Sequence, residues 1–532
     1  MSEEKILTQK LSRRELLRKA ALGGAGVVAA SAIAACATPT PQVIKETVIV
    51  KETVPVKEVV KETVPVEKVV TKEVEKVVTK EVIKEVTVAP TPAPERYNGY
   101  TAPSKPVPPG KIQFYVGVSA EGEKALADEF KNVFGKFNPG VTVEIINVAG
   151  EEKLLALIAA GTPPDVWWTP HAGTIQVADG SVLDITDFIK DDPIMDDVLP
   201  AFLAPYKGLD GGLYGLPNGT WFWLIFYNKK VLDEAKMPYP THDWTWDDLL
   251  AVAQKLTKEG QWGFYNSGIV WGGGLMPYIF SNGGRDISED GTRFMLDAPE
   301  SVEAIQFLYD LVFKHKVMPS PADVKGLGLT DRQAFANGKI AMHSDGSPPD
   351  WAFPIFAETL GWGNFDVVLL PHPKGKSLVN WAGFGGFSVS AKTKNPQAAV
   401  ELLKFLARGA DLWWPDPCYK SGVAAYVDEY LKQFPQLKDT HWQEAFEVGV
   451  NKVRFAYSNN PFTIYRYASK DWGAFNDRLW MGKVKPEDLK TEVPKWNAKY
   501  AAGLEKDLKE VPLKPAYKEA LQKLLEEVKK RG

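Results

Sequence analysis

Side chains with reactive potential are sparse in this chain of 532 residues, and few of them show spacings typical of catalysis. There are two cysteines, Cys36 and Cys418, and six histidines that lie far apart. The sequence has no GxSxG nucleophile turn, no HExxH zinc motif and no CxxC pair. The segment "GKS" at 375–377 lacks the first glycine of a phosphate-binding loop, and "GFGGFS" at 383–388 is one glycine short of a dinucleotide-binding loop. We therefore expect no catalytic residue, no metal site and no cofactor.

Cys36 ends a short apolar run that follows a basic leader. Residues 20–35 are mostly Ala, Gly and Val, and the run is shorter than the roughly 20 residues that a membrane-spanning helix needs. Arg13 and Arg14 stand as a pair before it. A charged leader, a short apolar segment and then small residues are the order of an export signal. The pattern predicts a signal peptide over residues 1–35.

Two features of this leader resemble known sorting signals. The paired arginines are similar to the Tat class, and "IAAC" at 33–36 resembles a bacterial lipobox. In a lipobox the cysteine thiol is acylated, and the cysteine becomes the first residue of the mature protein. The alternatives are cleavage without lipid, or an ordinary helix that ends in cysteine. The resemblance implies lipidation at Cys36, attachment to the cell membrane and a location outside the cytoplasm.

The segment after Cys36 has a very restricted composition. Residues 42–88 are almost only Val, Lys, Glu and Thr, and "EKVVTKEV" occurs twice in succession at 67–74 and 75–82. An eight-residue period does not keep one face along a helix. Side chains of this kind cannot bury enough surface to offset the entropy of ordering. We expect residues 36–110 to be a lipid-anchored stalk with extended or locally helical backbone, closed by a Pro-rich linker; a charge-rich tail without a role is the alternative.

The remaining residues, 111–532, are enough for two domains. At the start of this part of the chain, segments with strand patterns alternate with segments whose apolar residues have helical spacing. The strands are predicted at 111–118, 141–148 and 165–168, and the helices at 126–137 and 151–161. This alternation predicts a mostly parallel sheet with helices on its faces. Ligands of such sheets bind at the carboxyl ends of the strands, here residues 117–121 and 168–173.

The alternation continues through the rest of the chain. It predicts a strand entering a helix at 221–235, a helix at 245–256, a helix at 298–316, a helix and strand at 331–344 and a helix at 395–409. Thr245 and Asp248 have the spacing of a capping box. The 63 basic and 67 acidic residues give a formal net charge of −4, which argues against a nucleic-acid partner.

Five segments resemble one family in its order along the chain. They are "GTPPDVWW" (161–168), "GGLYGLP" (211–217), "FYNKKVLDEA" (226–235), "FANGKIAM" (335–342) and "SAKTKNPQAAVELLKFLA" (390–407). Together they resemble the extracellular solute-binding proteins of ABC importers, in the carbohydrate-binding group that includes maltose-binding protein. Residues 411–532 match only loosely. The resemblance implies two α/β lobes joined by crossing hinge strands that close on a ligand, and permease subunits as partners.

The resemblance also implies a set of ligand-binding residues. Sugars present flat CH faces beside hydroxyls, so a sugar site needs aromatic platforms with a few polar groups at their edges. The implied residues are Ser119, Glu121, Trp168, His171, Trp221, Trp271, Asp345 and Trp351. We expect Trp168 and Trp351 to stack on ligand, although any single tryptophan can instead be a core residue and His171 an ordinary surface histidine. Maltodextrin binders commonly carry carboxylates where this chain has His171 and Trp221, and the loop at 344–351 is expected to be long.

Three functions follow from these observations. The first is a lipoprotein that captures a sugar or oligosaccharide outside the cell and delivers it to an ABC permease. The second is a protein of the same fold that binds another solute, such as a peptide or a phosphorylated polyol. The third is a tethered carbohydrate-active enzyme with a carboxylate pair that includes residues such as Glu121 or Glu123. No cluster of Arg or Lys stands near the implied cleft loops, which favours a neutral ligand.

Overall fold

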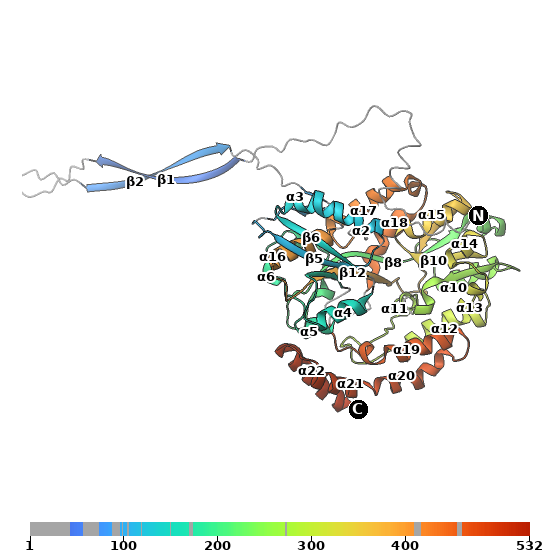
Figure 1. Ribbon diagram of the computed structural model, residues 1–532. Helices are drawn as coiled ribbons and strands as arrows, with labels where there is room; N and C mark the ends of the chain where they lie inside the picture. Colours follow the sequence, from blue (N-terminus) through green and yellow to red (C-terminus); the bar gives the residue numbers. More distant parts are fainter. Residues whose placement is uncertain are drawn as a thin grey trace, which may run out of the picture. The chain divides into compact units, whose positions relative to one another are not determined.

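The structure is a computed structural model. It describes residues 43–56, 74–87, 96–97, 99–103, 106–118, 120–148, 150–169, 174–271, 274–408, 417–454 and 460–531. These form two compact units, one within residues 22–95 and one from Arg96 onward (Figure 1). Arg13, Arg14 and Cys36 lie outside the described residues, so the export signal and the lipidation site stay predictions.

The first unit is an antiparallel pair of strands, β1 (Val43–Val56) and β2 (Val74–Thr87). The register runs from Val43 opposite Thr87 to Val56 opposite Val74, and it sets Lys45 against Glu85. Val, Ile and Thr favour extended backbone, and opposite charges at facing positions support a pairing. The described backbone is extended, as the sequence allows, but its pairing into a hairpin is not predicted by the composition.

The second unit is built on a mixed sheet of nine strands in the order β6-β5-β7-β12-β8-β10-β9, with β11 on β8 and β13 on β12. The strands are β5 (Gly110–Val116), β6 (Val141–Asn147), β7 (Val166–Trp168), β8 (Leu216–Asn228), β9 (Trp262–Asn266), β10 (Ile340–Gly346), β11 (Phe365–Leu369), β12 (Asn380–Val389) and β13 (Val453–Arg454). A two-residue pair, β3 (Arg96–Tyr97) and β4 (Tyr100–Thr101), precedes them.

Lobe one comprises the described residues within 106–215 and 387–408. Its strands β6, β5 and β7 are parallel, as the sequence predicts. The helices are α2 (Ala120–Glu129), the π-helical turn η1 (Phe130–Phe134), α4 (Glu151–Ala159) and α16 (Pro396–Ala407). Phe114, Phe130, Phe134 and Phe405 pack edge to face or tilted in the core between sheet and helices. The five elements predicted between 111 and 168 are confirmed.

Lobe two comprises residues 223–379. Its helices include α10 (Trp246–Leu256), α12 (Pro299–Phe313), α14 (Asp331–Ala336) and α15 (Pro349–Leu360). The predicted capping box of α10 is confirmed, because the Thr245 N–H donates to Asp248 Oδ2 at 2.8 Å and the Asp248 N–H donates to Thr245 Oγ1 at 3.3 Å. Strands β9 and β10 of this lobe pair in parallel.

Two long strands connect the lobes. The first part of β8, Leu216 to Phe222, pairs with β12, and its second part, Trp223 to Asn228, pairs with β10 and β11. Strand β12 continues into lobe one by pairing with β7. The chain enters lobe two on β8 and returns on β12, so the two strands are antiparallel. The expectation of a mostly parallel sheet is therefore wrong at the centre of the sheet, although the predicted crossing strands are present.

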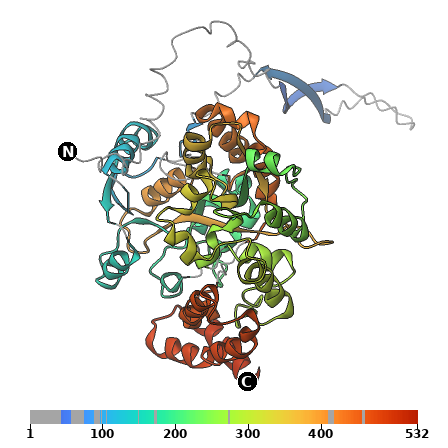
Figure 2. The ribbon, with the colours of Figure 1, turned by 90° about the vertical axis from the view of Figure 1, so that its right-hand side faces the viewer.

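The C-terminal part of the chain is helical. Helices α19 (Ile464–Trp480), α20 (Leu489–Asn497), α21 (Tyr500–Glu510) and α22 (Pro515–Arg531) lie together on one side of this unit in both views (Figures 1 and 2). The other helical segments are α3 (Gly135–Phe137), α5 (Ile175–Ala178), α6 (Thr186–Ile189), α7 (Ile194–Asp197), α8 (Pro200–Leu203), η2 (Ala204–Tyr206), α9 (Lys229–Ala235), η3 (Ser267–Trp271), α11 (Met276–Ser281), α13 (Pro321–Gly326), α17 (Lys420–Gln433), η4 (Pro435–Asp439), α18 (Trp442–Gly449), η5 (Val450–Lys452) and η6 (Pro486–Asp488). Among the described helices, none has the length and apolar character required to span a membrane.

The linker joins this unit at lobe one. Tyr100 is buried, its hydroxyl donates to Glu401 Oε2 at 3.0 Å, and Asn138 Nδ2 donates to the Tyr100 oxygen at 3.0 Å. Its ring contacts Phe137 and Phe405 edge to face. Both hydrogen-bond partners belong to lobe one, so the chain is fixed to that lobe before the first strand of the sheet begins.

Candidate ligand-binding site

Trp168 is the last residue of β7 and 47 % of its surface is exposed. Its indole lies over β12, because a Cβ at Gly385 would stand 2.5 Å from Trp168 Nε1. A side chain at position 385 would displace the indole, so glycine at that point of the strand permits the close approach. The tryptophan is therefore not a core residue, which was the alternative for it, and it lies at the carboxyl end of a parallel strand.

Trp221 on β8 is the centre of a group of tryptophans. Its ring centroid lies 5.3 Å from that of Trp223, 5.4 Å from that of Trp351 and 5.1 Å from that of Trp381. Trp223 and Trp381 are buried, whereas Trp221 and Trp351 are partly exposed. Edge and tilted ring contacts at these distances stabilise the group beyond the area that it buries. The two buried rings both pack against Trp221, and Trp221 in turn contacts Trp351.

Glycines of β12 bring these aromatics together. A Cβ at Gly383 would overlap the indole nitrogen of Trp221, as one at Gly385 would overlap that of Trp168. Residues two apart on a strand share one face and lie about 6–7 Å apart. Trp168 and Trp221 therefore cover the same face of β12 at neighbouring positions. The "GFGGF" segment, which resembles an incomplete dinucleotide loop in the sequence, is a strand that provides space for two indoles.

Asn218 is a polar residue of this region that the sequence analysis missed. The register of β8 against β12 shifts between Gly219 opposite Gly385 and Pro217 opposite Gly386, so Asn218 is the extra residue of a β-bulge. Its side chain is buried, and Oδ1 has no hydrogen-bond partner among the residues that the structure describes. Oδ1 lies 3.1 Å from the place of a Gly385 Cβ, the same point that Trp168 Nε1 approaches. Bulges often redirect a side chain beside functional sites.

An unpaired buried amide oxygen costs about 1–3 kcal/mol of folding stability. Such a group in a native protein calls for an explanation other than stability. At the Trp168 edge, Asn218 Oδ1 is an acceptor suited to a hydroxyl donor. The local signal in the sequence is only the Pro-Asn-Gly order at the start of β8, and the bulge that redirects the side chain depends on a partner strand more than 160 residues away.

Asp345, at the end of β10, is bonded to an arginine and lies close to a histidine of the protein. Arg332 Nε donates to its Oδ2 at 2.6 Å, Arg332 Nη2 donates to its Oδ1 at 2.8 Å, and His343 Nε2 lies 3.3 Å from Oδ2. Burial alone would raise the pKa of this carboxyl, but the hydrogen bonds and charges of Arg332 and His343 outweigh it and hold the pKa well below its ordinary value. Both oxygens are bonded within the protein, so Asp345 holds the end of β10, and its expected contact with ligand stays a prediction.

Trp351 follows that strand end closely. Only Ser347 and Pro348 separate β10 from α15, and Trp351 lies in the first turn of the helix. The long loop expected at 344–351 is therefore wrong, because strand and helix take up most of those residues. The Trp351 ring covers Gly346, where a Cβ would stand 2.6 Å from two of its ring carbons.

The structure describes only the backbone of two of the other expected residues and does not describe the remaining two. Ser119 and His171 lie outside the described residues. Glu121 belongs to the first turn of α2 and Trp271 is the last residue of η3, and only their backbones are described. Of the eight, the structure thus brings Trp168, Trp221 and Trp351 to one region, and places Asp345 beside it in an ion pair. The described residues contain no group of three or more His, Cys, Asp or Glu side chains arranged to hold a metal ion.

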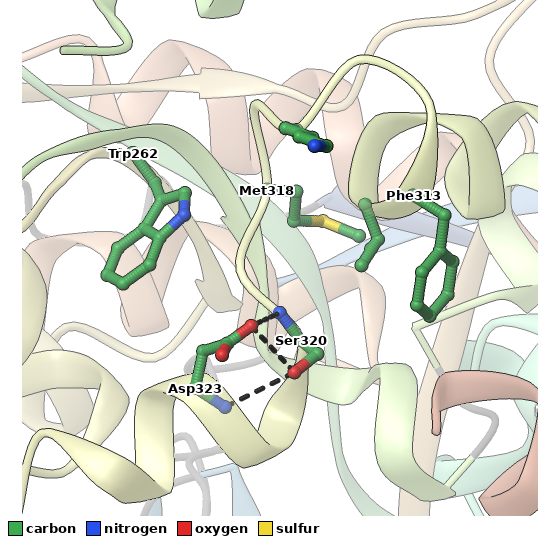
Figure 3. Close-up of a pocket in the computed structure, with 7 residues that line it drawn as sticks. Trp262, Phe313, Met318, Ser320 and Asp323 are labelled. Carbon is green, nitrogen blue, oxygen red and sulfur yellow. Dashed lines mark hydrogen bonds between the residues drawn. The ribbon is translucent and has the colours of Figure 1, made fainter. Parts of the chain in front are cut away.

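A cavity of about 300 Å³ lies elsewhere, between the start of β9 and the end of α12 (Figure 3). It is lined by Trp262, Val312, Phe313, Lys316, Met318, Ser320 and Asp323. None of these residues belongs to the tryptophan group. Ser320 and Asp323 bond to each other as the capping box of α13, as the dashed lines show, so their polar atoms are already used. We therefore place the candidate site at the tryptophans.

The family described as bacterial extracellular solute-binding protein matches residues 125–411. The arabinooligosaccharide-binding protein of Halalkalibacterium halodurans is 26% identical over 42% of this chain and 49% of its own length. The maltodextrin-binding protein MdxE of Bacillus subtilis is 28% identical over 57% of this chain and 71% of its own length. The chain thus spans about half the length of the first of these relatives.

Solved structures share the fold. The substrate-binding protein Lmo0181 of Listeria monocytogenes, in complex with cycloalternan, has a TM-score of 0.59 at 24% identity over 74% of this chain and 99% of its own. The acarbose-binding receptor GacH of Streptomyces glaucescens has a TM-score of 0.56 at 22% identity over 74% of this chain and 99% of its own. At these identities the likeness concerns the arrangement of the lobes. The matched residues include β8, β12 and Trp168, and they end before the C-terminal helices.

Proposed function

Because this chain belongs to the bacterial extracellular solute-binding proteins, we propose that it captures a neutral oligosaccharide outside the cell and delivers it to the permease subunits of an ABC transporter. The family resemblance found in the sequence is confirmed by this membership. The observation that carries the choice of ligand is the pair of indoles, Trp168 and Trp221, over Gly385 and Gly383 on one face of β12.

The chemistry of this face supports a sugar. Adjacent indoles offer flat apolar surfaces for the CH faces of sugar rings, and the Asn218 oxygen offers an acceptor for a hydroxyl at the edge of Trp168. Two arginines of this region, Arg332 beside Asp345 and Arg454 opposite Trp381, have partners within the protein. Arg332 is paired with Asp345, and the Arg454 guanidinium lies 4.7 Å from the centre of the Phe280 ring. An anionic ligand would need cations that are held less firmly.

The names of the relatives support the same class of ligand. The curated relatives are described as binding arabinooligosaccharides and maltodextrins, and the solved structures hold cycloalternan and acarbose. These proteins are described as binding proteins, which supports transport and not catalysis as the role of this chain. We extend to this chain the class of neutral oligosaccharides, without choosing among these sugars.

We further propose that the protein is a lipoprotein of the cell membrane. The family description already places its members outside the cytoplasm. Acylation at Cys36 would hold the chain at the membrane, and residues 36–110 would separate the lipid from the binding lobes. A tether raises the effective concentration of a binding protein at a membrane permease, because capture and delivery then occur within the reach of the linker.

Calorimetric titration of the full chain tests the ligand class. The panel comprises a maltooligosaccharide, an arabinooligosaccharide, a galactooligosaccharide, glycerol 3-phosphate and a tripeptide. We expect saturable binding of one oligosaccharide and a rise in melting temperature with its concentration, because a ligand of the folded state stabilises it by mass action. Saturation only by glycerol 3-phosphate or the peptide would support the second function. Cleavage of a bound sugar, detected by chromatography, would support an enzyme.

A further inference from the structure

The C-terminal strap, residues 460–531, contacts both lobes. Its first part lies on lobe two, and α22 returns to lobe one (Figures 1 and 2). The family match ends at residue 411, so the strap lies beyond the segment that defines the family.

The attachment to lobe two is made through the loop before α12. The Ile464 N–H donates to the Gly291 carbonyl at 2.9 Å, and Tyr465 Oη donates to Asp286 Oδ2 at 3.1 Å. Asn497 accepts from the Phe294 N–H at 2.8 Å. Aromatic contacts of Phe294 with Tyr465 and Trp496 cover these bonds. Helices α19 and α20 are thus fixed to lobe two by both backbone and side chains.

Helix α21 is joined to α19 within the strap. Asp507 of α21 accepts from Arg466 Nε at 2.6 Å and from Tyr467 Oη at 2.7 Å. The Tyr500 hydroxyl donates to the Phe462 carbonyl. These contacts make α19 to α21 one packed group, so its position is set by lobe two.

The attachment to lobe one is made by Lys514 and Tyr517. The Lys514 N–H donates to the Ala178 carbonyl at 2.8 Å, and Lys514 Nζ contacts Asp210 Oδ2 at 2.8 Å and the Tyr214 hydroxyl at 2.6 Å. The same ammonium lies 4.2 Å and 4.7 Å from the centres of the Tyr214 and Tyr517 rings. Tyr517 is fully buried, and its oxygen accepts from the Leu209 N–H.

Lys514 and Asp210 form a partly buried ion pair at this attachment. Burial would raise the pKa of Asp210, but the bonds from Lys514 and Tyr214 outweigh it and lower the pKa below its ordinary value. A cation between two aromatic faces and a carboxylate gains from both kinds of contact when water is partly excluded. Lys514 therefore joins α22 to lobe one at one well-defined point.

This point lies at the base of a crossing strand. Tyr214 stands two residues before Leu216, where β8 begins its passage to lobe two. The link between α21 and α22 is short, because α21 ends at Glu510 and α22 begins at Pro515. A rotation of one lobe against the other about β8 and β12 must therefore bend this link or release the Lys514 attachment.

We propose that the C-terminal strap restrains the relative motion of the two lobes in the ligand-free protein. It is a second connection between the lobes, in addition to the crossing strands. A restraint of this kind narrows the range of interlobe arrangements before ligand arrives, so less conformational entropy is lost on binding. The restraint acts on the protein whatever ligand it takes, so it is independent of the proposed sugar.

Distance measurements between the lobes test the restraint. Lys131→Cys in lobe one and Lys325→Cys in lobe two provide two exposed thiols for spin labels. The full chain also carries Cys36→Ser, and Cys418 is buried, so the label attaches at the two new cysteines. In the ligand-free protein, Lys514→Glu should broaden the distribution of distances, because it sets like charges against each other at Asp210. Exchange of the two charges, Lys514→Glu with Asp210→Lys, should narrow it again.

A matched control keeps the result specific. Lys506→Glu breaks the ion pair with Glu510, which joins two exposed side chains of the same helix α21 and no two elements, and it should leave the interlobe distribution unchanged. If Lys514→Glu lowers the melting temperature, Lys514→Gln serves as the milder variant. An unchanged distribution in both Lys514 variants would overturn the proposal. A second measurement rests on the proposed function: the affinity of Lys514→Glu for the oligosaccharide should be lower than that of the parent protein by about 5-fold or more.

Discussion

At the scale of single residues, solvent exposure separates the tryptophans that can contact ligand from those that belong to the core. Trp168 has half of its surface in solvent, whereas Trp381 is buried below Trp221. The sequence alone predicts that both are large apolar residues, and it cannot separate them, because exposure depends on which strands lie alongside. The family resemblance selected Trp168, Trp221 and Trp351, and the structure brings these three to one region. The resemblance did not select Asn218, because the position of its side chain depends on a β-bulge between β8 and β12.

Replacement of Trp168 should separate binding from stability. Trp168→Ala should weaken oligosaccharide binding by about 1–3 kcal/mol, by analogy with the loss of an aromatic anchor, and should change folding stability little because the ring is exposed. Trp381→Ala is the matched control and should cost about 3–5 kcal/mol of folding stability, because it empties a buried volume. Calorimetry and urea denaturation of each variant measure the two effects. Unchanged affinity in Trp168→Ala would remove this residue from the proposed site.

The ion pair of Asp345 predicts a dependence on pH. The pKa of Asp345 in the folded protein lies below its unfolded value of about 3.9, so its stabilising contribution is present above that pH and is lost as pH falls toward the folded pKa. Asp345→Asn should cost about 3 kcal/mol at pH 7, because it leaves the Arg332 guanidinium without its counter-charge. The difference from the parent protein should shrink at pH 3. Urea denaturation at both pH values checks this, and an equal difference at both would contradict it.

At the scale of elements, local patterns predicted helices better than strands. Helix α10 was predicted with its capping box because the box is a contact between residues three apart. Strand β12 was not predicted, since a glycine-rich segment read alone is typical of a loop. Its glycines are explained only by indoles from β7 and β8, which belong to distant parts of the chain. The same holds for 344–351, where strand and helix follow each other with a two-residue link.

The glycine at the site provides a test of β12 as a platform. Gly385→Ala should displace the Trp168 indole, since the new methyl group would stand 2.5 Å from Nε1, and it should reduce oligosaccharide affinity about as much as loss of the ring. Gly326→Ala is the control, because no atom lies within 4 Å of the Cβ position there. Tryptophan fluorescence should shift in the first variant and not in the second. Normal affinity in Gly385→Ala would show that the close approach is not needed for binding.

At the scale of the whole molecule, the sequence predicted two lobes and crossing strands but not the strap. The lobes follow from alternating strands and helices and from the family motifs within 161–407. The strap depends on contacts such as that of Lys514 with Asp210, which are about 300 residues apart. No local pattern of charge or hydrophobicity in α22 indicates which lobe it will contact. The signal peptide, the lipid anchor and the stalk's role stay predictions from the leader and its composition.

The membrane anchor is tested at this scale. Cys36→Ser should move the protein from the membrane fraction to the soluble extracytoplasmic fraction, because the acylated thiol is the proposed attachment. Ligand affinity of the released protein should equal that of the parent, since the binding residues lie beyond Arg96. Membrane fractionation with immunodetection measures the first effect and calorimetry the second. Full retention in membranes would contradict lipidation at Cys36.

The attachment of Tyr100 has a mechanical consequence. The hydroxyl bonds to Glu401 and Asn138 both belong to lobe one, so a pulling force along the linker enters the protein through that lobe. None of the load path from Arg96 to these bonds passes through β8 or β12. In a protein anchored as proposed, tension between the membrane and lobe one would therefore be borne by lobe one and not by the crossing strands. The proposed tether would thus pull on a lobe and not on the hinge between the lobes.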